Sequence, residues 1–216
     1  MSKLGNTKLG TAIRRDFNTS ALVLISLCIG LNIVGQFFTQ SLRLPLWLNV
    51  QGSMIAGILA GPWVGAVTGL LTNVVAGFTI EGPTAFFFAP VNATYGIVAG
   101  LLAARGWFRH GGRAALSGFV GELASVPIGA PIVVLVFGGI TTGASSAITG
   151  FLMASGQNIW NAVILGSIFV DGADKVLSAL IAFYVIRSVS KRNLVKFSRA
   201  SANLDLEPTT PEPVPA

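Results

Sequence analysis

Charge is scarce in this sequence: only 10% of the 216 residues are Asp, Glu, Lys or Arg, whereas 52% are hydrophobic. The mean hydropathy is +0.73. Soluble domains carry about 25% charged residues, so the composition excludes an ordinary soluble domain and indicates a membrane protein. Because each span needs ~20 apolar residues, the chain is long enough for one domain of about six transmembrane helices.

Cysteine and histidine each occur once, as Cys28 and His110. A single cysteine excludes an internal disulfide and any multi-thiolate metal site, and a single histidine excludes a His-rich metal site. The sequence also lacks the motifs G-x-x-x-x-G-K-[ST], H-E-x-x-H and G-x-S-x-G. Asp171 and Asp174 are three residues apart in one segment, which is not the geometry of an aspartyl dyad drawn from two segments. We therefore predict that the protein is not an enzyme and has no catalytic residue, metal or cofactor.

Three charged residues stand together at the head of the last hydrophobic segment. No charged residue occurs from 123 to 170, and then Asp171, Asp174 and Lys175 stand at the head of the apolar run 176–186. A charge inside a bilayer costs at least a few kcal/mol, so such residues usually face a partner or a water-filled cavity. One interpretation is therefore a functional cavity. The other is a helix start, with Asp171 capping the first turn and pairing with Lys175 at i, i+4 spacing.

Six hydrophobic segments are predicted as transmembrane helices: 21–39, 46–60, 62–79, 84–104, 114–136 and a last helix that ends near 189. The second and third helices are expected to meet at Gly61 and Pro62, because Gly terminates helices and Pro begins them. The second helix would be only ~22 Å long, against ~30 Å for the hydrocarbon core of a bilayer. It would therefore leave a recess at its head, where Asn49 and Gln51 lie.

The fourth segment carries Pro90, which is expected to bend the helix, and then Asn92 and Tyr95. These two residues share one face because they are three positions apart. That face forms either a wall of a ligand site or a buried hydrogen bond between helices. The fifth segment contains Glu122, an intramembrane carboxylate for which the sequence indicates no partner.

Basic residues predict the topology, because cytoplasmic loops collect Lys and Arg. Of the 14 basic residues, 12 lie in residues 1–20, in the loop 105–113 and in the flank 187–199. All three regions are cytoplasmic if six helices cross the membrane, so the net charge of +6 does not indicate nucleic-acid binding. The apolar segment 147–170 is therefore not a seventh crossing. We interpret it as an outer loop, a re-entrant segment or an N-terminal extension of the last helix.

The predicted organisation is a cytoplasmic segment 1–20, a six-helix substrate-binding domain 21–189, and a cytoplasmic region 190–216. This last region is a basic flank followed by an acidic, Pro-rich tail expected to be disordered. The topology brings the heads of the second, fourth and last helices together in the outer leaflet. We predict there a recess that opens to the outside and binds a small polar substrate. Its candidate residues are Asn49, Gln51, Asn92, Tyr95, Asn158, Asn161, Asp171, Asp174 and Lys175.

Three stretches, in this order, resemble the substrate-binding S component of energy-coupling factor (ECF) vitamin transporters. They are 44–52 running into the stretch 61–66, then Ala89-Pro-Val-Asn92, then 170–175 at the opening of the last helix. The resemblance extends over about 21–189. It is nearest to the riboflavin-type members, whose fourth helix also carries Pro-x-Asn.

The resemblance implies a six-helix protein of a prokaryotic cell membrane that binds a small water-soluble vitamin or vitamin precursor from outside. It also implies docking on a transmembrane coupling subunit that works with two ATPase subunits. Family members dock through small residues on the first helix, typically Ala-xxx-Ala, and Ser26 and Gly30 are the nearest match in this chain. Asp171 and Asp174 stand where riboflavin-type members have Pro-Phe-Asn, which implies a ligand other than riboflavin with donor or cationic groups.

The residues alone leave two other functions open. Glu122, Asp171 and Asp174 could form the proton relay of a stand-alone secondary carrier or channel for a small polar solute, although the two halves show no internal repeat. The third function is a membrane assembly subunit without a ligand. Alanine replacement of the two aspartates separates the three, because it abolishes ligand binding, proton-coupled flux or neither.

Overall fold

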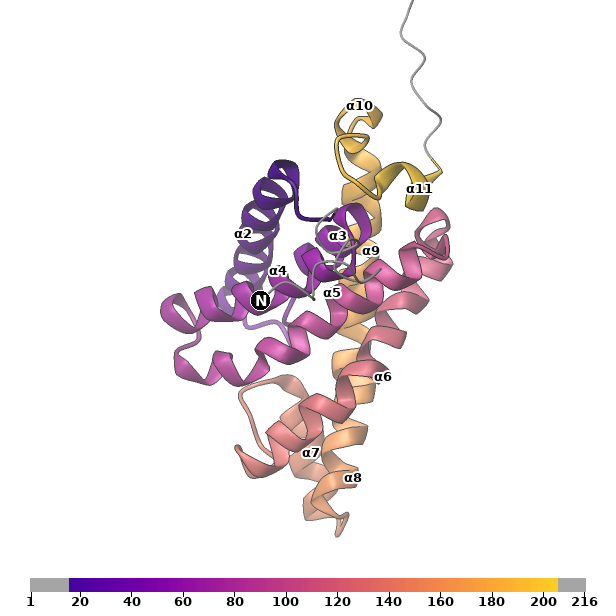
Figure 1. Cartoon of the computed structure of the whole chain (residues 1–216). Coiled ribbons are helices and arrows are strands. Elements are labelled where there is room, and N and C mark those ends of the chain that lie inside the picture. Colours follow the sequence, from indigo (N-terminus) through magenta and orange to yellow (C-terminus); the bar gives the residue numbers. More distant parts are fainter. Residues whose placement is uncertain (1–15, 206–216) are drawn as a thin grey trace, which may run out of the picture.

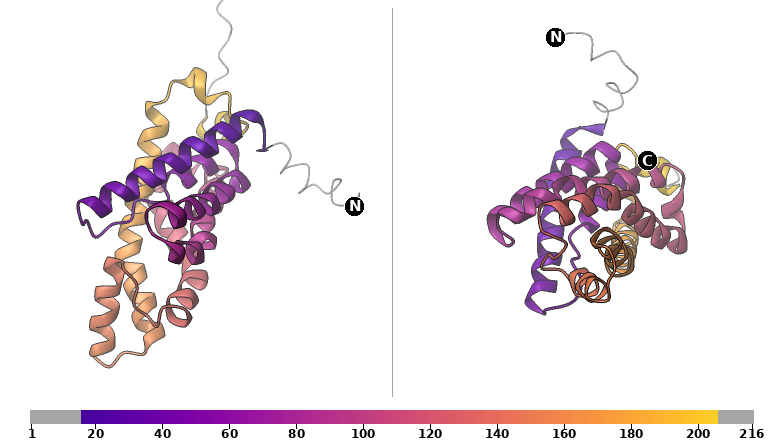
Figure 2. Two further views of the ribbon diagram at one scale, coloured as in Figure 1. Left: turned by 90° about the vertical axis from the view of Figure 1, so that its left-hand side faces the viewer. Right: turned by 90° about the horizontal axis from the view of Figure 1, so that it is seen from below.

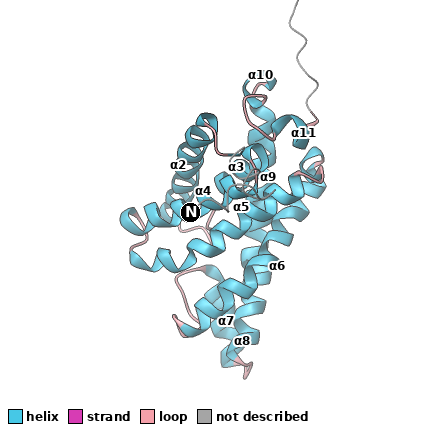
Figure 3. Ribbon diagram, in the orientation of Figure 1, coloured by secondary structure: helices cyan, strands magenta, loops and turns pink. Residues whose placement is uncertain are grey.

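The structure, a computed structural model, describes residues 16–205, and every regular element in this range is helical (Figure 1, Figure 3). The predicted all-α fold is confirmed for this range. The predictions for residues 1–15 and 206–216 lie outside the described residues. The main helices are α2 (Thr19–Ser41), α3 (Gln51–Ala60), α4 (Pro62–Thr79), α5 (Ala89–Ala103), α6 (Gly111–Leu135), α7 (Ala144–Ala154), α8 (Ile159–Gly166) and α9 (Gly172–Ser188). Shorter elements are η2 (Pro83–Phe88), η3 (Trp107–Arg109), η4 (Ser167–Asp171), α10 (Lys191–Leu194) and α11 (Ala200–Leu204).

Three segments of the described residues are long and apolar enough to cross a membrane: Thr19–Ser41, Pro83–Ala103 and Gly111–Leu135. The helix surfaces also carry large apolar side chains. Leu27, Phe78 and Leu135, for example, are 67%, 79% and 74% exposed. Apolar surface of this extent is stable against lipid and not against water. The helices are therefore those of a membrane protein.

The predicted helix boundaries are partly confirmed. α3 ends one residue before Gly61, whose φ of 113° suits glycine, and α4 begins at Pro62 as the Gly-Pro signal predicts. The start of α3 was predicted at 46 and is wrong, because the helix begins only at Gln51 and Leu48 has a positive φ of 42°. Pro90 lies in the first turn of α5, after η2, so it begins an α-helix where a bend within one was expected.

Glycines allow α3, α4 and α5 to approach one another closely. A Cβ on Gly65 of α4 would lie 2.7 Å from the carbonyl oxygen of Gly96 and 2.8 Å from the Cα of Gly57. Contacts this short do not occur between a real Cβ and a backbone, so a side chain at Gly65 would force the helices apart. Small residues that let backbones touch are typical of helix packing in membranes. The three helices thus form one tightly packed layer, in which α4 contacts α5 most extensively.

The last long helix begins earlier in the chain than predicted. α8 continues through the π-helical turn η4 into α9, and α7 folds back against α8 to form a helical hairpin at one end of the molecule (Figure 1, Figure 2). Of the three interpretations of 147–170, the N-terminal extension therefore applies from Ile159 onwards, whereas α7 is a separate helix. The alternative of Asp171 as a helix cap is wrong, because its backbone is helical and its side chain makes no capping bond.

Residues that follow α9 provide hydrogen-bond partners for the C-terminal end of α3. The carbonyl oxygens of Ile58 and Leu59 accept hydrogen bonds from the Asn203 side chain (2.6 Å) and from the Arg199 backbone N–H (3.0 Å). Arg199 also forms a bidentate ion pair with the fully buried Asp16, at 2.8 and 2.9 Å. The last carbonyls of a helix need partners outside the helix, and here α11 and its flank provide them. α10 and α11 lie at the same end of the molecule as the start of α2 (Figure 1).

Candidate functional site

A cavity of about 740 Å³ lies between the loop 42–50, which we call the roof loop, and helices α5 and α6. Residues 139–146, which we call the hydroxyl loop and which include the first turn of α7, line another side together with Thr149 of α7. Cavities of about 300–1,000 Å³ with a few polar groups are typical of small-molecule sites. The lining combines apolar side chains such as Phe88, Val91 and Val133 with charged and amide groups.

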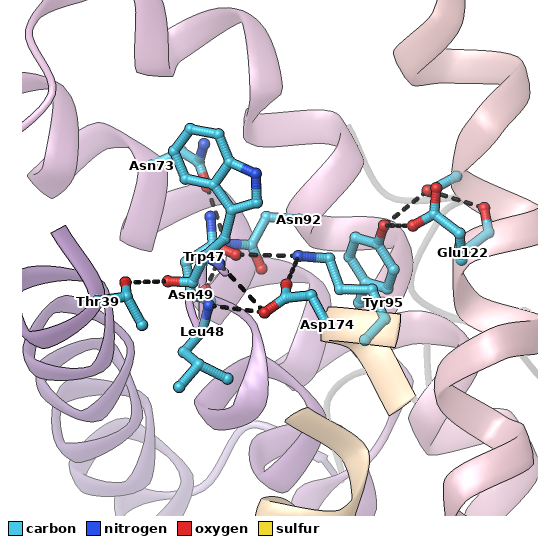
Figure 4. Close-up of polar contacts among 11 residues, drawn as sticks. Thr39, Trp47, Leu48, Asn49, Asn73, Asn92, Tyr95, Glu122 and Asp174 are labelled. Carbon is cyan, nitrogen blue, oxygen red and sulfur yellow. Dashed lines mark hydrogen bonds and ion pairs between the residues drawn. The ribbon is translucent and has the colours of Figure 1, made fainter. Parts of the chain in front are cut away.

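Asp174 of α9 fixes the roof loop. Its Oδ1 accepts hydrogen bonds from the backbone N–H groups of Trp47 and Leu48, both at 3.1 Å (Figure 4). The Thr39 hydroxyl at the end of α2 lies 2.9 Å from the carbonyl oxygen of Gln36 and 3.2 Å from that of Trp47, and its one hydrogen is shared between them. Asp174 thus anchors the roof loop at Leu48, whose backbone has a positive φ.

Lys175 is buried beside Asp174 and forms an ion pair with its Oδ2 at 2.6 Å. The ammonium also donates to Asn49 Oδ1 at 3.3 Å and lies 5.3 Å from the centre of the Tyr95 ring. The predicted pairing of Lys175 with Asp171 is therefore replaced by a pairing with the neighbouring Asp174. Because both charges of this pair are buried, removal of either side chain would leave an unpaired buried charge.

Glu122, which lacked a partner in the sequence, has one in the structure. The Tyr95 hydroxyl donates to Glu122 Oε2 at 2.5 Å and lies 2.8 Å from the Ser125 hydroxyl oxygen (Figure 4). All three side chains are buried, and all three line the cavity. Tyr95 thereby links α5 to α6 across the cavity wall.

The Asn92 side chain is committed to contacts between helices. Its Nδ2 donates to the carbonyl of Asn49 (3.1 Å) and to Asn73 Oδ1 (2.8 Å), and its Oδ1 accepts from the Ser53 hydroxyl (2.8 Å). Both N–H donors of an amide are then used. The structure therefore supports the alternative of a buried hydrogen bond between helices, and Asn92 shapes the cavity more than it presents free groups to it.

The nine predicted binding residues are distributed unequally. Five of them line the cavity: Asn49, Asn92, Tyr95, Asp171 and Lys175. Asp174 is not part of the lining, but it binds two parts of the lining, the roof loop and Lys175. Gln51 lies between α2 and α3, where its Nε2 donates to the carbonyl of Leu31 at 3.2 Å.

Two of the nine lie at the far hairpin. Asn158 caps α8 by accepting from the Trp160 N–H at 2.8 Å, and both Asn158 and Asn161 are exposed and outside the cavity lining. Their predicted place at the site is wrong, because α8 pairs with α7 in a hairpin that carries both residues away from the cavity.

The hydroxyl loop also lines the cavity, and none of its residues was predicted as a site residue. Thr141 and Ser146 close this loop on itself, because the Ser146 hydroxyl oxygen accepts from the Thr141 N–H at 2.8 Å. Gly143 faces the Trp47 ring of the roof loop, and a Cβ there would lie 2.6 Å from Trp47 Cζ2. The run Thr-Thr-Gly-Ala-Ser-Ser could have indicated a part of the site. It places several hydroxyl groups next to Gly143, a residue that permits close contact.

The described residues contain no group of three or more His, Cys, Asp or Glu side chains placed to hold a metal ion. Ser26 and Gly30, the predicted docking residues, are exposed on the outer face of α2. No atom lies within 4 Å of the position that a Cβ on Gly30 would occupy. That part of α2 is thus open to a partner helix.

Comparison with protein-family models identifies a family for most of the chain. The family model described as ECF transporter, substrate-specific component, matches residues 20–186. The matched range runs from the start of α2 to the last turn of α9, so it contains the whole cavity lining. The chain matches no curated protein and no solved structure.

Proposed function

The chain belongs to the family of ECF transporter substrate-specific components, and from this we propose that it captures a small water-soluble vitamin or vitamin precursor outside a prokaryotic cell. It is a membrane transport component and not an enzyme. It would deliver its substrate by docking on a transmembrane coupling subunit that is driven by two ATPase subunits. The absence of a phosphate-binding motif fits this division of labour, because the partners would supply ATP hydrolysis.

The observation that carries this proposal is the cavity beside the roof loop. Its volume of about 740 Å³ suits a molecule of vitamin size, and the roof loop beside it is held by the buried Asp174. A mostly apolar lining with a few fixed polar groups binds one small molecule selectively. A water-filled channel needs no such loop.

We further propose six membrane crossings with both ends of the chain in the cytoplasm. The start of α2 and the segment α10–α11 lie at one end of the molecule, and the α7–α8 hairpin lies at the other (Figure 1, Figure 2). The basic residues of the flank 187–199 lie at the former end, as expected for a cytoplasmic face. The cavity would then open outwards, and Ser26 and Gly30 on α2 would contact the coupling subunit.

The test is native mass spectrometry of the full chain purified from cells grown in rich medium, with metabolites extracted from the same sample. We expect one vitamin-like molecule bound at a stoichiometric level. A protein that is empty, and that retains no candidate vitamin at micromolar concentration, would contradict the capture function. Flux of a small solute and protons through the isolated protein in vesicles would favour the stand-alone carrier instead.

A further inference from the structure

We propose that the substrate presents a cationic or N–H donor group to Asp171, so that the protein binds a nitrogen base or amine in preference to an organic anion. This inference rests on the proposed capture function and specifies the ligand class of the same cavity. It concerns one carboxylate among the several acidic groups of the site.

Asp171 is the carboxylate of the cavity lining that the protein satisfies only in part, since the hydroxyl groups of Ser145 and Ser167 lie near it and one of its oxygens remains without a donor. Its Oδ1 is buried and has no hydrogen-bond partner among the described residues, and the side chain lines the cavity. Asp174, one turn further along the same helix, contrasts with it: its two oxygens accept from Trp47, Leu48 and Lys175. A carboxylate is an acceptor only, and a buried one without a donor is strongly unfavourable. A donor carried by the ligand would remove this penalty.

The other charged groups near the cavity are engaged elsewhere. Glu122 accepts from Tyr95, and Glu81 accepts from the Gln36 side chain. The charge of Lys175 is matched by Asp174 at 2.6 Å. These pairings leave Oδ1 of Asp171 as the acidic oxygen of the lining that is buried and has no hydrogen-bond partner among the described residues.

Besides the paired Lys175, the basic residue of the cavity lining is Arg43. Arg43 lines the cavity, but it is exposed at the start of the roof loop, where water screens its charge. An organic anion held there would leave Oδ1 of Asp171 without a donor. An ammonium or protonated ring nitrogen at Asp171 would instead form a charge-assisted hydrogen bond in a poorly hydrated environment.

The first experiment compares the full-length wild type with Asp171→Asn and with the control Asn161→Ala, all purified in parallel from rich medium. Asp171→Asn keeps the shape of the side chain but removes its charge, whereas Asn161 is exposed and outside the cavity lining. We expect the extracted molecule to carry an amine, amidine or ring N–H group. Its occupancy should fall by about tenfold or more in Asp171→Asn, as for loss of a charge-assisted hydrogen bond, and stay unchanged in the control. A copurifying molecule without such a group, or one that Asp171→Asn retains fully, would overturn the inference while leaving the capture function intact.

The second experiment uses matched probes in case nothing copurifies. Tryptamine and indole-3-acetate, and likewise pyridoxamine and 4-pyridoxate, differ chiefly in an ammonium against a carboxylate. We expect the amine of at least one pair to raise the melting temperature of the wild type and of Asn161→Ala, but not of Asp171→Asn. Stabilisation by the carboxylate members instead would overturn the inference. An empty protein that responds to none of the four probes would count against the capture function itself and against this inference with it.

Discussion

At the scale of single residues, the pair of Asp174 and Lys175 carries the strongest energetic consequence. The two side chains are 1% and 6% exposed, so each charge depends on the other. Removing one partner of a buried ion pair costs about 3–5 kcal/mol, because the remaining charge is left unpaired. Asp174→Asn should therefore lower the free energy of unfolding in detergent by about that amount, measured by denaturant titration. It should also release the roof loop, because the anchor of the Trp47 and Leu48 N–H groups is weakened.

The double variant Asp174→Asn with Lys175→Met is the control for this prediction. It removes both charges, so most of the lost stability should return even though the roof loop stays weakened. If the single variant is as stable as the wild type, the pair is not buried as the structure describes. If the double variant is less stable than the single one, the charges were not the cause.

Single residues were predictable where the reason was local. Asn92 and Tyr95 share a side of α5 as their spacing predicts, and Asp171 lines the cavity as its position at the head of a helix suggested. The sequence could not show that Asp174 bonds the N–H groups of residues 126 and 127 positions away. It also could not show that Tyr95 reaches Glu122, because that contact depends on how α5 and α6 are packed.

At the scale of elements, the contact of α4 with α5 depends on a glycine. Gly65→Ala would place a Cβ 2.7 Å from the carbonyl oxygen of Gly96, and the backbone on both sides has no room to move. Overpacking of this kind typically costs about 1–3 kcal/mol. We therefore expect a lower melting temperature for this variant in a thermal unfolding assay. Gly150→Ala on α7 is the matched control, because no atom lies within 4 Å of its Cβ position. Equal melting temperatures for Gly65→Ala and the wild type would contradict the close approach of the helices.

The end of α3 gives a second prediction at this scale. Arg199 is partly exposed, but its partner Asp16 is fully buried, so Arg199→Ala leaves a buried carboxylate unpaired. We expect a loss of about 2–4 kcal/mol in the free energy of unfolding, together with greater protease cleavage between α9 and α11. Arg192→Ala, which removes an exposed arginine of the same flank, should change stability little. A fully stable Arg199→Ala protein would show that the flank does not close α3.

The boundaries of helices were also predictable where their cause is local in the sequence, and not where the cause is a contact with a distant residue. The junction of α3 and α4 was predictable, because Gly61 and Pro62 determine it from within the chain. The start of α3 was not, since residues 46–50 are apolar enough for a helix and are held out of it by Asp174 of α9. Likewise, no local signal shows that Arg199 and Asn203 bind the last carbonyl groups of α3.

At the scale of the whole molecule, the proposed topology follows from two ends that differ in chemistry. One end carries the start of α2 and the flank after α9, with its basic residues, whereas the other carries the α7–α8 hairpin, whose tip has no charged residue (Figure 2). Positive charge is retained in the cytoplasm, and an uncharged tip is free to cross the membrane during insertion. The two ends should therefore face opposite compartments, with the cavity open on the side of the hairpin.

Cysteine labelling tests this orientation directly, because Cys28 is the one native cysteine and is buried. In a Cys28→Ser background, Asn158→Cys at the hairpin tip should react with a membrane-impermeant maleimide on intact spheroplasts. His110→Cys, in the loop before α6, should react only after the cells are permeabilised; both positions are exposed in the structure. The cysteine-free background gives the level of non-specific labelling. Labelling of His110→Cys from outside would reverse the proposed orientation, and labelling of both from outside would exclude an odd number of crossings between them.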